Sequence, residues 1–354
     1  MMERLRSFVR SNIPVYEASN GCVYPLDKNE NLLIPRELIE GIIARAASKT
    51  DPRLYPQGEE TELAEMLAEM LSVERDMVNI TNGADEAIDL LLTLAGVLVK
   101  EPRVLTLKPS FPMYALRSLV RGYRVDYIPL REGDFGFDID VAVDKASKSD
   151  LVFLCSPNNP TGNLVDKRLI RAVAESTKGL VVVDQAYIEF SDDKQEDLIN
   201  SYENLAVVRT FSKAYGLAGL RLGYIVAGSD VSRAIRVIKL PFQINKFSLL
   251  VGIEALRARE EILRYVEEVK RLRKVLVSRL RGIDYLEPYD TQTNFVFVRP
   301  SLDMDLIDRT LRSRGMCVRL YRGLFREGDQ YIRISVPREE VIDLLIKALE
   351  DMGS

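Results

Sequence analysis

The order of apolar and polar residues divides the chain into regions with different predicted secondary structure. In the stretches 35–49 and 60–71, and again after Asp85, apolar residues recur at helical spacing. Farther along, helical stretches alternate with short, continuous apolar runs at 104–107, 124–128, 151–155, 180–183, 206–208 and 222–226. Continuous runs are typical of strands buried on both faces. Their alternation with helices predicts an α/β fold with a mostly parallel central sheet flanked by helices.

Beyond residue 240 the pattern changes. A long charged helical stretch at 248–281 leads into apolar strands at 294–298, 317–320 and 331–336, and a last helix begins at Arg338. This order of elements predicts a smaller α+β domain. We therefore expect a large domain at 40–245 and a small domain formed by residues 246–354 together with 1–39, which include an N-terminal arm.

Composition excludes several kinds of chemistry. The 354 residues include no histidine, which rules out a catalytic triad that uses histidine and a metal bound through histidine. Proton transfer must therefore be carried out by Lys, Asp, Glu, Tyr or Cys. We expect no metal, because no cluster of carboxylates has ligand spacing. The formal net charge of −4 gives no reason to expect a nucleic-acid partner.

The N-terminus and the cysteines bear on the compartment. Residues 1–15 include several charged residues and lack the apolar core of a signal peptide, and no apolar run is long enough to span a membrane. We therefore expect a cytoplasmic protein. Cys22, Cys155 and Cys317 are too few and too scattered to predict a disulfide framework. We expect all three to be buried apolar residues in a reducing compartment.

Polar or glycine-containing loops follow three of the predicted strands, at 156–162, 184–187 and 210–213. Ligands of open α/β sheets bind at the carboxyl ends of strands, so these loops are candidate site segments. Asp184 ends an apolar strand, where a buried carboxylate is costly unless a cation accompanies it. The plainer alternative is an aspartate that caps the next turn.

Lys213 lies between Ser212 and a glycine-rich segment that contains Arg221. A hydroxyl, backbone N–H groups and a guanidinium together suit a phosphate, although a lone lysine after a strand is ordinarily solvated. A lysine beside a phosphate site can form a Schiff base with an aldehyde if its surroundings lower its pKa. Pyridoxal 5'-phosphate supplies both groups, and a carboxylate such as Asp184 keeps its ring nitrogen protonated. These residues therefore predict pyridoxal phosphate as the cofactor.

A second anion site is predicted at 81–86, Thr-Asn-Gly-Ala-Asp-Glu. Gly83 allows close approach of the backbone, and Ala84 and Asp85 would open a helix whose free N–H groups can hold phosphate. An ordinary helix cap by the preceding threonine or asparagine is the alternative. Phe111, which follows a predicted strand, would lie either on the cofactor ring or in the core.

Four motifs resemble those of fold-type-I pyridoxal-phosphate aminotransferases: Ser-Pro-Asn-Asn-Pro-Thr-Gly at 156–162, Val-Val-Asp-Gln-Ala-Tyr at 182–187, Ser-Lys at 212–213 and Gly-Leu-Arg-Leu-Gly at 219–223. Within that superfamily the chain is most similar to the histidinol-phosphate aminotransferases. Further matching fragments are Tyr-Pro at 55–56, Asn-Gly-Ala-Asp-Glu at 82–86 and Tyr-Ile-Arg-Ile-Ser-Val at 331–336. The resemblance extends over essentially the whole chain.

The resemblance implies a role for each matching residue. Lys213 would carry the cofactor and move a proton between substrate and cofactor, Asp184 would pair with the ring nitrogen, and Tyr187 would hydrogen-bond the ring oxygen. Tyr55 would reach the phosphate of the neighbouring subunit's cofactor, which predicts a homodimer with shared active sites. The remaining implied cofactor contacts are Asn159 at the ring oxygen, Phe111 stacked on the ring, and Ala84, Asp85, Ser212 and Arg221 at the phosphate.

For the substrate, Arg333 matches the arginine that binds the acidic end. Arg322, Arg319 and Tyr16 of the N-terminal arm are further implied contacts. A guanidinium binds a carboxylate and a phosphate equally well, so one site can alternate between glutamate and histidinol phosphate in a ping-pong cycle. The resemblance thus implies transamination of histidinol phosphate with 2-oxoglutarate and glutamate, a step of histidine biosynthesis.

Three other functions stay open. They are an aromatic or broad-specificity amino-acid aminotransferase, a lyase similar to threonine-phosphate decarboxylase, and a cofactor-binding regulatory module, which the intact Lys213 argues against. The chain also departs from the family: Gln185 stands where Glu is usual, Phe111 where Tyr is common, and Leu32 where Pro is usual. None replaces the lysine, the aspartate or the arginine on which the cofactor chemistry depends.

Overall fold

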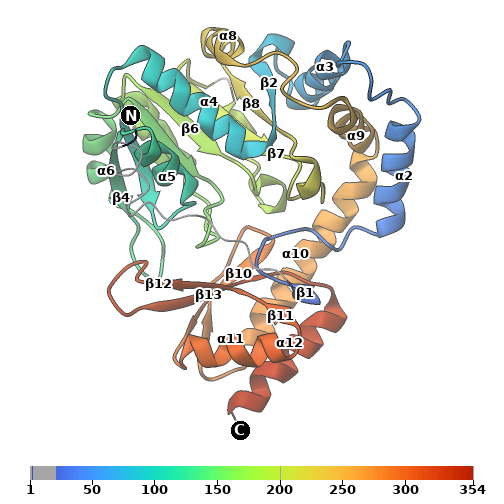
Figure 1. Ribbon diagram of the computed structural model, residues 1–354. Helices are drawn as coiled ribbons and strands as arrows, with labels where there is room; N and C mark the ends of the chain where they lie inside the picture. Colours follow the sequence, from blue (N-terminus) through green and yellow to red (C-terminus); the bar gives the residue numbers. More distant parts are fainter. Residues whose placement is uncertain (1, 3–20, 200, 354) are drawn as a thin grey trace.

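A seven-stranded sheet forms the centre of the larger part of the molecule (Figure 1). The computed structural model describes Met2 and residues 21–199 and 201–353. From one edge to the other the strands are β2 (Val78–Thr81), β8 (Gly223–Ala227), β7 (Leu205–Thr210), β6 (Leu180–Asp184), β5 (Leu151–Cys155), β3 (Arg103–Lys108) and β4 (Arg124–Pro129). All neighbours are parallel except that β8 runs antiparallel to both β2 and β7. The predicted mostly parallel sheet is confirmed.

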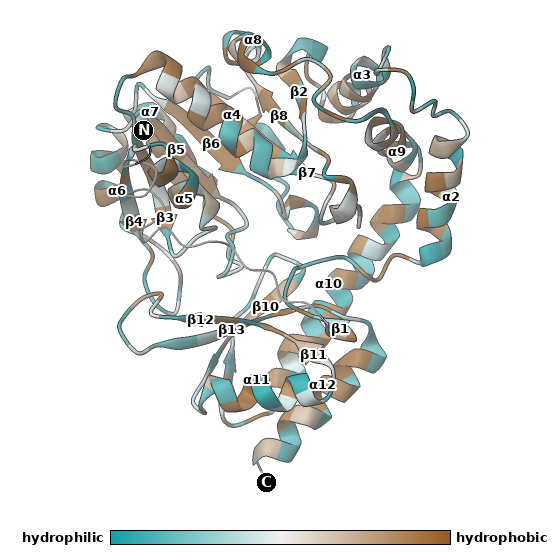
Figure 2. Cartoon of the chain, viewed as in Figure 1, coloured by the Kyte–Doolittle hydropathy of each residue, from teal (hydrophilic) through white to brown (hydrophobic). Residues whose placement is uncertain are grey.

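Helices cover both faces of this sheet (Figure 1). On one face lie α4 (Gly83–Leu98), α5 (Met113–Val120) and α8 (Ser229–Ile238), and on the other α6 (Ile139–Ala146) and α7 (Lys167–Ser176). Successive strand residues point to opposite faces, so Val182 belongs to the core under α4 while Val181 and Val183 belong to the other core. This two-sided burial explains why the central strands are apolar at consecutive positions, as Figure 2 shows.

Three helices pack together beside the β2 edge of the sheet: α2 (Arg36–Ala47), α3 (Glu59–Leu71) and α9 (Lys246–Arg257). We predicted a single helix at 248–281, but the structure has two, because α9 ends at Ala258 and α10 (Arg259–Arg281) follows. Ala258 has φ −93° and ψ 13°, outside the helical range. Nearly every residue of α9 is buried, whereas α10 buries one face, so the two helices meet different surroundings.

The smaller part of the molecule is an antiparallel sheet with helices against it. Its strand order is β12 (Arg319–Arg322), β13 (Gln330–Ser335), β10 (Phe295–Pro300) and β9 (Leu286–Pro288), and its helices are α10, α11 (Met304–Ser313) and α12 (Glu339–Gly353). Short 3-10 helices lie at Arg75–Met77, Ile188–Phe190, Glu196–Leu198 and Ala218–Leu220. The smaller α+β part agrees with the sequence, whereas the domain boundaries at residues 40 and 245 stay a prediction.

The N-terminal segment joins this smaller part. β1 (Tyr24–Pro25) pairs in parallel with β11 (Met316–Cys317), and Cys22 forms a disulfide with Cys317 across a Cα–Cα distance of 5.8 Å. Our expectation for these two cysteines was therefore wrong, because pairing of the two strands brings together residues 295 positions apart. Cys155 is buried and free. Among the described helices, none has the length and apolar character needed to cross a membrane.

Candidate active site

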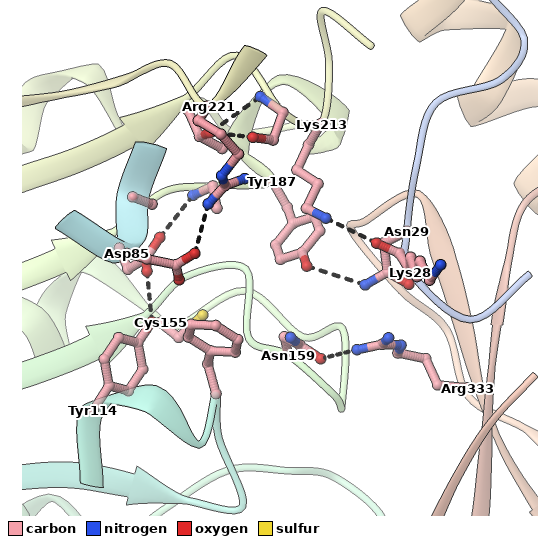
Figure 3. Close-up of a pocket in the computed structure, with 16 residues that line it drawn as sticks. Lys28, Asn29, Asp85, Tyr114, Cys155, Asn159, Tyr187, Lys213, Arg221 and Arg333 are labelled. Atoms are coloured by element: carbon pink, nitrogen blue, oxygen red, sulfur yellow. Dashed lines mark hydrogen bonds and ion pairs between the residues drawn. The ribbon is translucent and has the colours of Figure 1, made fainter. Parts of the chain in front are cut away.

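A single pocket collects most of the residues singled out above. It lies where the carboxyl ends of β5, β6 and β7 face the small sheet (Figure 3). Parallel strands end at the same edge of a sheet, which is why loops far apart in sequence meet there. The pocket is lined by Lys28, Asn29, Ala84, Asp85, Phe111, Tyr114, Cys155, Asn159, Asp184, Ala186, Tyr187, Thr210, Ser212, Lys213, Arg221 and Arg333.

Lys213 points into this pocket from the loop that follows β7 (Figure 3). Its Nζ donates a hydrogen bond of 2.9 Å to the backbone oxygen of Lys28 and lies 5.8 Å from the centre of the Tyr187 ring. Burial, with a smaller contribution from the Arg333 guanidinium, lowers the pKa of Lys213 to about 8. Part of the population therefore carries a neutral, nucleophilic amine near neutral pH, as attack on an aldehyde requires.

Asp184 stands at the end of β6 and is buried. One carboxylate oxygen accepts a hydrogen bond of 2.7 Å from the Tyr114 hydroxyl, and the other accepts one of 3.0 Å from the Ala186 N–H. Burial raises the pKa of Asp184 to about 6, and both hydrogen bonds oppose that rise. Within the described residues no basic side chain forms an ion pair with it, so a protonated ring nitrogen would supply its cationic partner.

The first turn of α4 and the loop before β8 form one end of the pocket. α4 begins at Gly83, and no side chain caps it, so no side chain competes with a ligand for its first N–H groups. The guanidinium of Arg221 is held beside this turn by an ion pair of 2.7 Å with Asp85. Arg221 itself has the left-handed φ of +51°, an uncommon backbone conformation that recurs at ligand sites.

Two glycines allow Arg221 and strand β8 to approach the first turn of α4 closely. A Cβ on Gly83 would lie 3.0 Å from Nη2 of Arg221, and a Cβ on Gly223 would lie 2.8 Å from the carbonyl carbon of Gly83. Ser212 is buried alongside, and its hydroxyl accepts a hydrogen bond of 3.0 Å from Thr210. Backbone N–H groups, a hydroxyl and a guanidinium converge without intervening side chains, which is the donor set that a phosphate requires.

Tyr187 and Asn159 line the wall between the two ends of the pocket. The Tyr187 hydroxyl accepts a hydrogen bond of 3.0 Å from Asn29, which leaves its own proton free to be donated into the pocket. Burial raises the pKa of Tyr187, so the hydroxyl stays protonated. The Asn159 side-chain oxygen is 2.5 Å from Nη1 of Arg333.

Arg333 comes from β13 and is buried at the end of the pocket away from Arg221 (Figure 3). Its Nη2 donates a hydrogen bond of 2.5 Å to the backbone oxygen of Asp27, and its guanidinium carbon lies 5.3 Å from the centre of the Phe295 ring. Asn159 and Asp27 are uncharged at the atoms that accept these bonds. The guanidinium therefore keeps its full positive charge for an anionic ligand.

The structure brings ten predicted site residues into this pocket: Ala84, Asp85, Phe111, Asn159, Asp184, Tyr187, Ser212, Lys213, Arg221 and Arg333. It does not bring Tyr55 or Arg322 there. The Tyr55 side chain is 71% exposed and stacks on Phe242, while Arg322 is exposed and forms an ion pair with Asp305. Tyr16 lies outside the described residues. Arg319 pairs directly with Arg333 across β12 and β13.

Sequence reasoning missed several lining residues. Asn29 has no predicted role, yet the segment 27–29 supplies three contacts to Arg333, Lys213 and Tyr187. Two of these contacts come from backbone oxygens, which no side-chain pattern reveals. Tyr114 was assigned no role at all, although it lies three residues after Phe111.

Two of the three departures from the family pattern have structural partners. The Gln185 side-chain oxygen accepts a hydrogen bond of 2.9 Å from Nε of Arg209, so an amide stands where a carboxylate would form an ion pair. Phe111 packs edge-on against Tyr114, with ring centres 5.6 Å apart. Leu32 is 53% exposed.

The residues present fit pyridoxal phosphate. The phosphate cradle, the amine of Lys213 and the carboxylate of Asp184 suit the phosphate, the aldehyde and the ring nitrogen of that cofactor. Among the described residues, no group of three or more acidic or cysteine side chains is placed to hold a metal ion. Fold and site together define a pyridoxal-phosphate-dependent enzyme of fold type I.

Comparison with known proteins narrows this class. The family model of the class I and II aminotransferases matches residues 22–349, and the chain belongs to that family. Histidinol-phosphate aminotransferase 2 of Archaeoglobus fulgidus is 37% identical over 331 residues, which are 93% of each chain. The protein is a pyridoxal-phosphate-dependent aminotransferase, and its substrates are small molecules.

Solved structures show the same fold. Histidinol-phosphate aminotransferase of Sinorhizobium meliloti, crystallised with pyridoxal 5'-phosphate, superposes with a TM-score of 0.84 at 24% identity, covering 98% of this chain and 96% of that one. L-threonine-O-3-phosphate decarboxylase of Porphyromonas gingivalis superposes with a TM-score of 0.78 at 25% identity, covering 93% and 99%. The fold is thus similar to those of proteins named for two different reactions.

Proposed function

We propose that the protein transaminates histidinol phosphate, with glutamate and 2-oxoglutarate as the other amino and oxo acid pair. Arg333 carries this proposal. Its buried guanidinium lies at the end of the pocket opposite the phosphate cradle, where it can hold the anionic end of a substrate whose amine faces Lys213. A guanidinium binds either a phosphate or a carboxylate, so Arg333 can serve both half-reactions of the transamination. The name of the Archaeoglobus fulgidus relative supports the phosphorylated substrate.

The side chains divide the chemistry between them. When bound, pyridoxal phosphate supplies an aldehyde and a ring that delocalises the electron pair left at the substrate Cα. Lys213 Nζ, which points into the pocket, would hold and move the proton of the substrate Cα, a role that no histidine of this chain could fill. Asp184 would hold the ring nitrogen in its protonated form, and Tyr187 would donate a hydrogen bond to the ring oxygen. Arg333 fixes the substrate so that its Cα–H faces the amine.

Half-reactions test the substrate. Holoenzyme is mixed with histidinol phosphate alone and, separately, with phenylalanine, and the absorbance change from the pyridoxal to the pyridoxamine form is followed. We expect histidinol phosphate to convert the cofactor at least about 10-fold faster, because its phosphate carries up to two negative charges for Arg333 and the carboxylate of phenylalanine carries only one, and an added charge-assisted contact contributes about 1.5 kcal/mol. Faster conversion by phenylalanine would instead identify an aromatic aminotransferase.

The similarity to a solved decarboxylase makes a lyase the second candidate. Both reactions use a phosphorylated substrate, and which bond breaks depends on its orientation to the cofactor ring. Threonine phosphate is therefore incubated with holoenzyme without any oxo acid, and released CO₂ is measured. Steady CO₂ release would establish the lyase, whereas the proposed aminotransferase releases none.

A substitution tests the shared anion site. For Arg333→Ala we expect the Michaelis constants of histidinol phosphate and of glutamate both to rise, by roughly 100-fold, because each loses the same charged contact. Arg314→Ala is the matched control, since Arg314 pairs with Asp351 at the surface of the small part. An unchanged constant for glutamate would show that the two substrates use separate sites. The predicted contacts of Arg322 and Tyr16 stay predictions.

We further propose a homodimer in which two copies share their active sites. Exposed apolar side chains support it: Tyr55 and Phe242 stack at 4.6 Å, and Leu54 and Leu240 are exposed nearby in the chain. Patches of this kind usually mark an interface. In this arrangement Tyr55 reaches the phosphate of the partner's cofactor. The cytoplasmic location stays a prediction.

A further inference from the structure

The buried hydroxyl of Tyr114 makes one of the two hydrogen bonds that hold the Asp184 carboxylate. The Tyr114 O–H donates to Oδ2 at 2.7 Å, and the backbone N–H of Ala186 donates to Oδ1 at 3.0 Å. Each oxygen thus has one donor from the protein, and rotation of the carboxylate would break both bonds. A carboxylate oxygen accepts more than one hydrogen bond, so these donors leave room for a ring N–H.

The Tyr114 ring is fixed by its neighbours. The ring comes from α5 and lies flat on Phe153 of β5, with centroids 4.8 Å apart and planes 9° from parallel. Phe111 also contacts the Tyr114 ring, in a T-shaped arrangement, and Tyr114 has no exposed surface. In such a close-packed setting the hydroxyl cannot swing away from Asp184 without displacing both aromatic rings.

The hydroxyl is also a permanent donor. Burial and the nearby Asp184 raise the pKa of Tyr114, so it keeps its proton over the working pH range. A donor that never ionises favours the charged form of the carboxylate, which opposes the effect of burial on Asp184. The chain has no histidine that could take this place.

We propose that Tyr114 is a positioning residue, which holds Asp184 in the orientation and charge state that pair with the protonated ring nitrogen of the cofactor. This inference rests on pyridoxal phosphate as the cofactor, but it does not depend on which amino acid is the substrate. Tyr114 touches neither substrate nor the reacting atoms in this scheme, and it acts only through Asp184.

The test is Tyr114→Phe, which removes the hydroxyl and keeps the ring. We expect the affinity of the apoprotein for pyridoxal phosphate to fall about 10-fold or more, because a hydrogen bond to a charged group is lost. We also expect kcat to fall while the Michaelis constant of the amino substrate stays unchanged. Affinity is measured by titrating apoprotein with the cofactor and following the absorbance of the bound cofactor.

Tyr331→Phe is a closely matched control. Tyr331 is also fully buried, also stacks on a phenylalanine at 4.8 Å, and also donates to a carboxylate, that of Glu132, at 2.8 Å. It does not line the pocket. We therefore expect a comparable effect on thermal stability and no effect on cofactor affinity, which separates loss of a buried hydroxyl from loss of this particular contact.

A cofactor analogue with carbon in place of the ring nitrogen tests whether Tyr114 acts through the contact between Asp184 and that nitrogen. Because it has no nitrogen to pair with Asp184, wild type and Tyr114→Phe should bind it equally well. Equal weakening for cofactor and analogue would overturn the proposal in favour of a packing role, and so would no weakening for either. In an Asp184→Asn background, Tyr114→Phe should cost no further cofactor affinity, and a full additional loss would also overturn it. These binding results stand whether or not histidinol phosphate is the substrate.

Discussion

The side chain on which the reaction depends, Lys213, lies in surroundings that disfavour its charged form. Burial and the Arg333 guanidinium together lower its pKa to about 8. Its hydrogen bond to the Lys28 oxygen orients the amine without providing an anion that would stabilise the charge. An unperturbed lysine would be almost entirely protonated at neutral pH, and therefore unreactive toward an aldehyde.

A pH profile follows from this pKa. The rate at which apoprotein captures pyridoxal phosphate should rise about tenfold per pH unit below pH 8 and level off above it, because only the neutral amine attacks. Stopped-flow absorbance measures that rate. Lys213→Ala should show neither capture nor turnover. A midpoint near the ordinary lysine value of 10.5 would mean that the pocket does not lower the pKa.

The buried carboxylate of Asp184 should lower the stability of the apoprotein, in which no cofactor pairs with its charge. Its pKa of about 6 in the folded protein exceeds the value near 3.9 of an unfolded chain, so its contribution to stability is full below pH 4 and is lost as the pH rises through 6. Two pKa units correspond to about 3 kcal/mol by which the charged carboxylate destabilises the folded protein at high pH. Asparagine removes this destabilisation but has one acceptor fewer, and the lost hydrogen bond costs about 1 kcal/mol.

Apoprotein with Asp184→Asn should therefore be more stable than wild type at pH 8, by about 2 kcal/mol. The advantage should disappear by pH 4. Denaturant unfolding at both pH values measures it, and the same variant should lose activity when loaded with cofactor. A variant that is less stable than wild type at pH 8 would contradict the assignment of Asp184 as a carboxylate that burial destabilises in the absence of cofactor.

At the scale of elements, the phosphate cradle depends on how closely β8 approaches the first turn of α4. A Cβ on Gly223 would lie 2.8 Å from the Gly83 carbonyl carbon and 3.0 Å from the Ala84 nitrogen, both of which are backbone atoms that cannot move aside alone. Gly223→Ala should displace the start of α4 and weaken pyridoxal phosphate binding by at least about 10-fold.

Gly219 offers a matched control from the same motif, because a Cβ there meets no atom within 4 Å. Gly219→Ala should leave cofactor affinity within about twofold of wild type, as substitutions that meet no clash usually change little. Equilibrium titration of apoprotein with pyridoxal phosphate compares the two variants. Equal behaviour of both would show that the close approach of β8 is not needed for the cradle.

The disulfide next to the paired strands β1 and β11 should contribute to the stability of the protein. The disulfide between Cys22 and Cys317 fastens the segment whose residues 27–29 contact Lys213, Arg333 and Tyr187. Cys22→Ser should lower the free energy of unfolding by about 2–5 kcal/mol, the range usual when a long loop is released. Reductant should lower the stability of wild type to that of the variant and leave the variant unchanged. No response of wild type to reductant would contradict a stabilising disulfide.

At the scale of the whole molecule, shared active sites predict complementation between two inactive variants. Lys213→Ala and Tyr55→Ala are co-expressed, so that about half of the dimers contain one subunit of each kind. In such a dimer one site keeps both Lys213 and the partner's Tyr55, and about a quarter of wild-type activity should return. If Tyr55 serves its own subunit, no activity returns. Light scattering on wild type checks that the protein is dimeric.

The sequence by itself determined the parts of this protein that depend on local order. Continuous apolar runs predicted the parallel sheet because burial on both faces leaves no polar alternation. Asp184 and Lys213 could be placed in one site because each follows a predicted strand, and the carboxyl ends of parallel strands meet at one edge of the sheet. Arg221 precedes β8 and reaches the same edge because β8 runs antiparallel to its neighbours, which only the structure shows. The absence of histidine already assigned proton transfer to other groups.

Tertiary structure decided what depends on residues that meet only in space. The contact between Tyr114 and Asp184 joins positions 70 apart, and the disulfide beside the paired strands β1 and β11 joins cysteines 295 positions apart. Backbone oxygens of residues 27 and 28 have no side-chain signature, so their contacts to Arg333 and Lys213 could not be read from residue types. Hydropathy and motifs describe neighbours along the chain, whereas hydrogen bonds and packing act between neighbours in three dimensions.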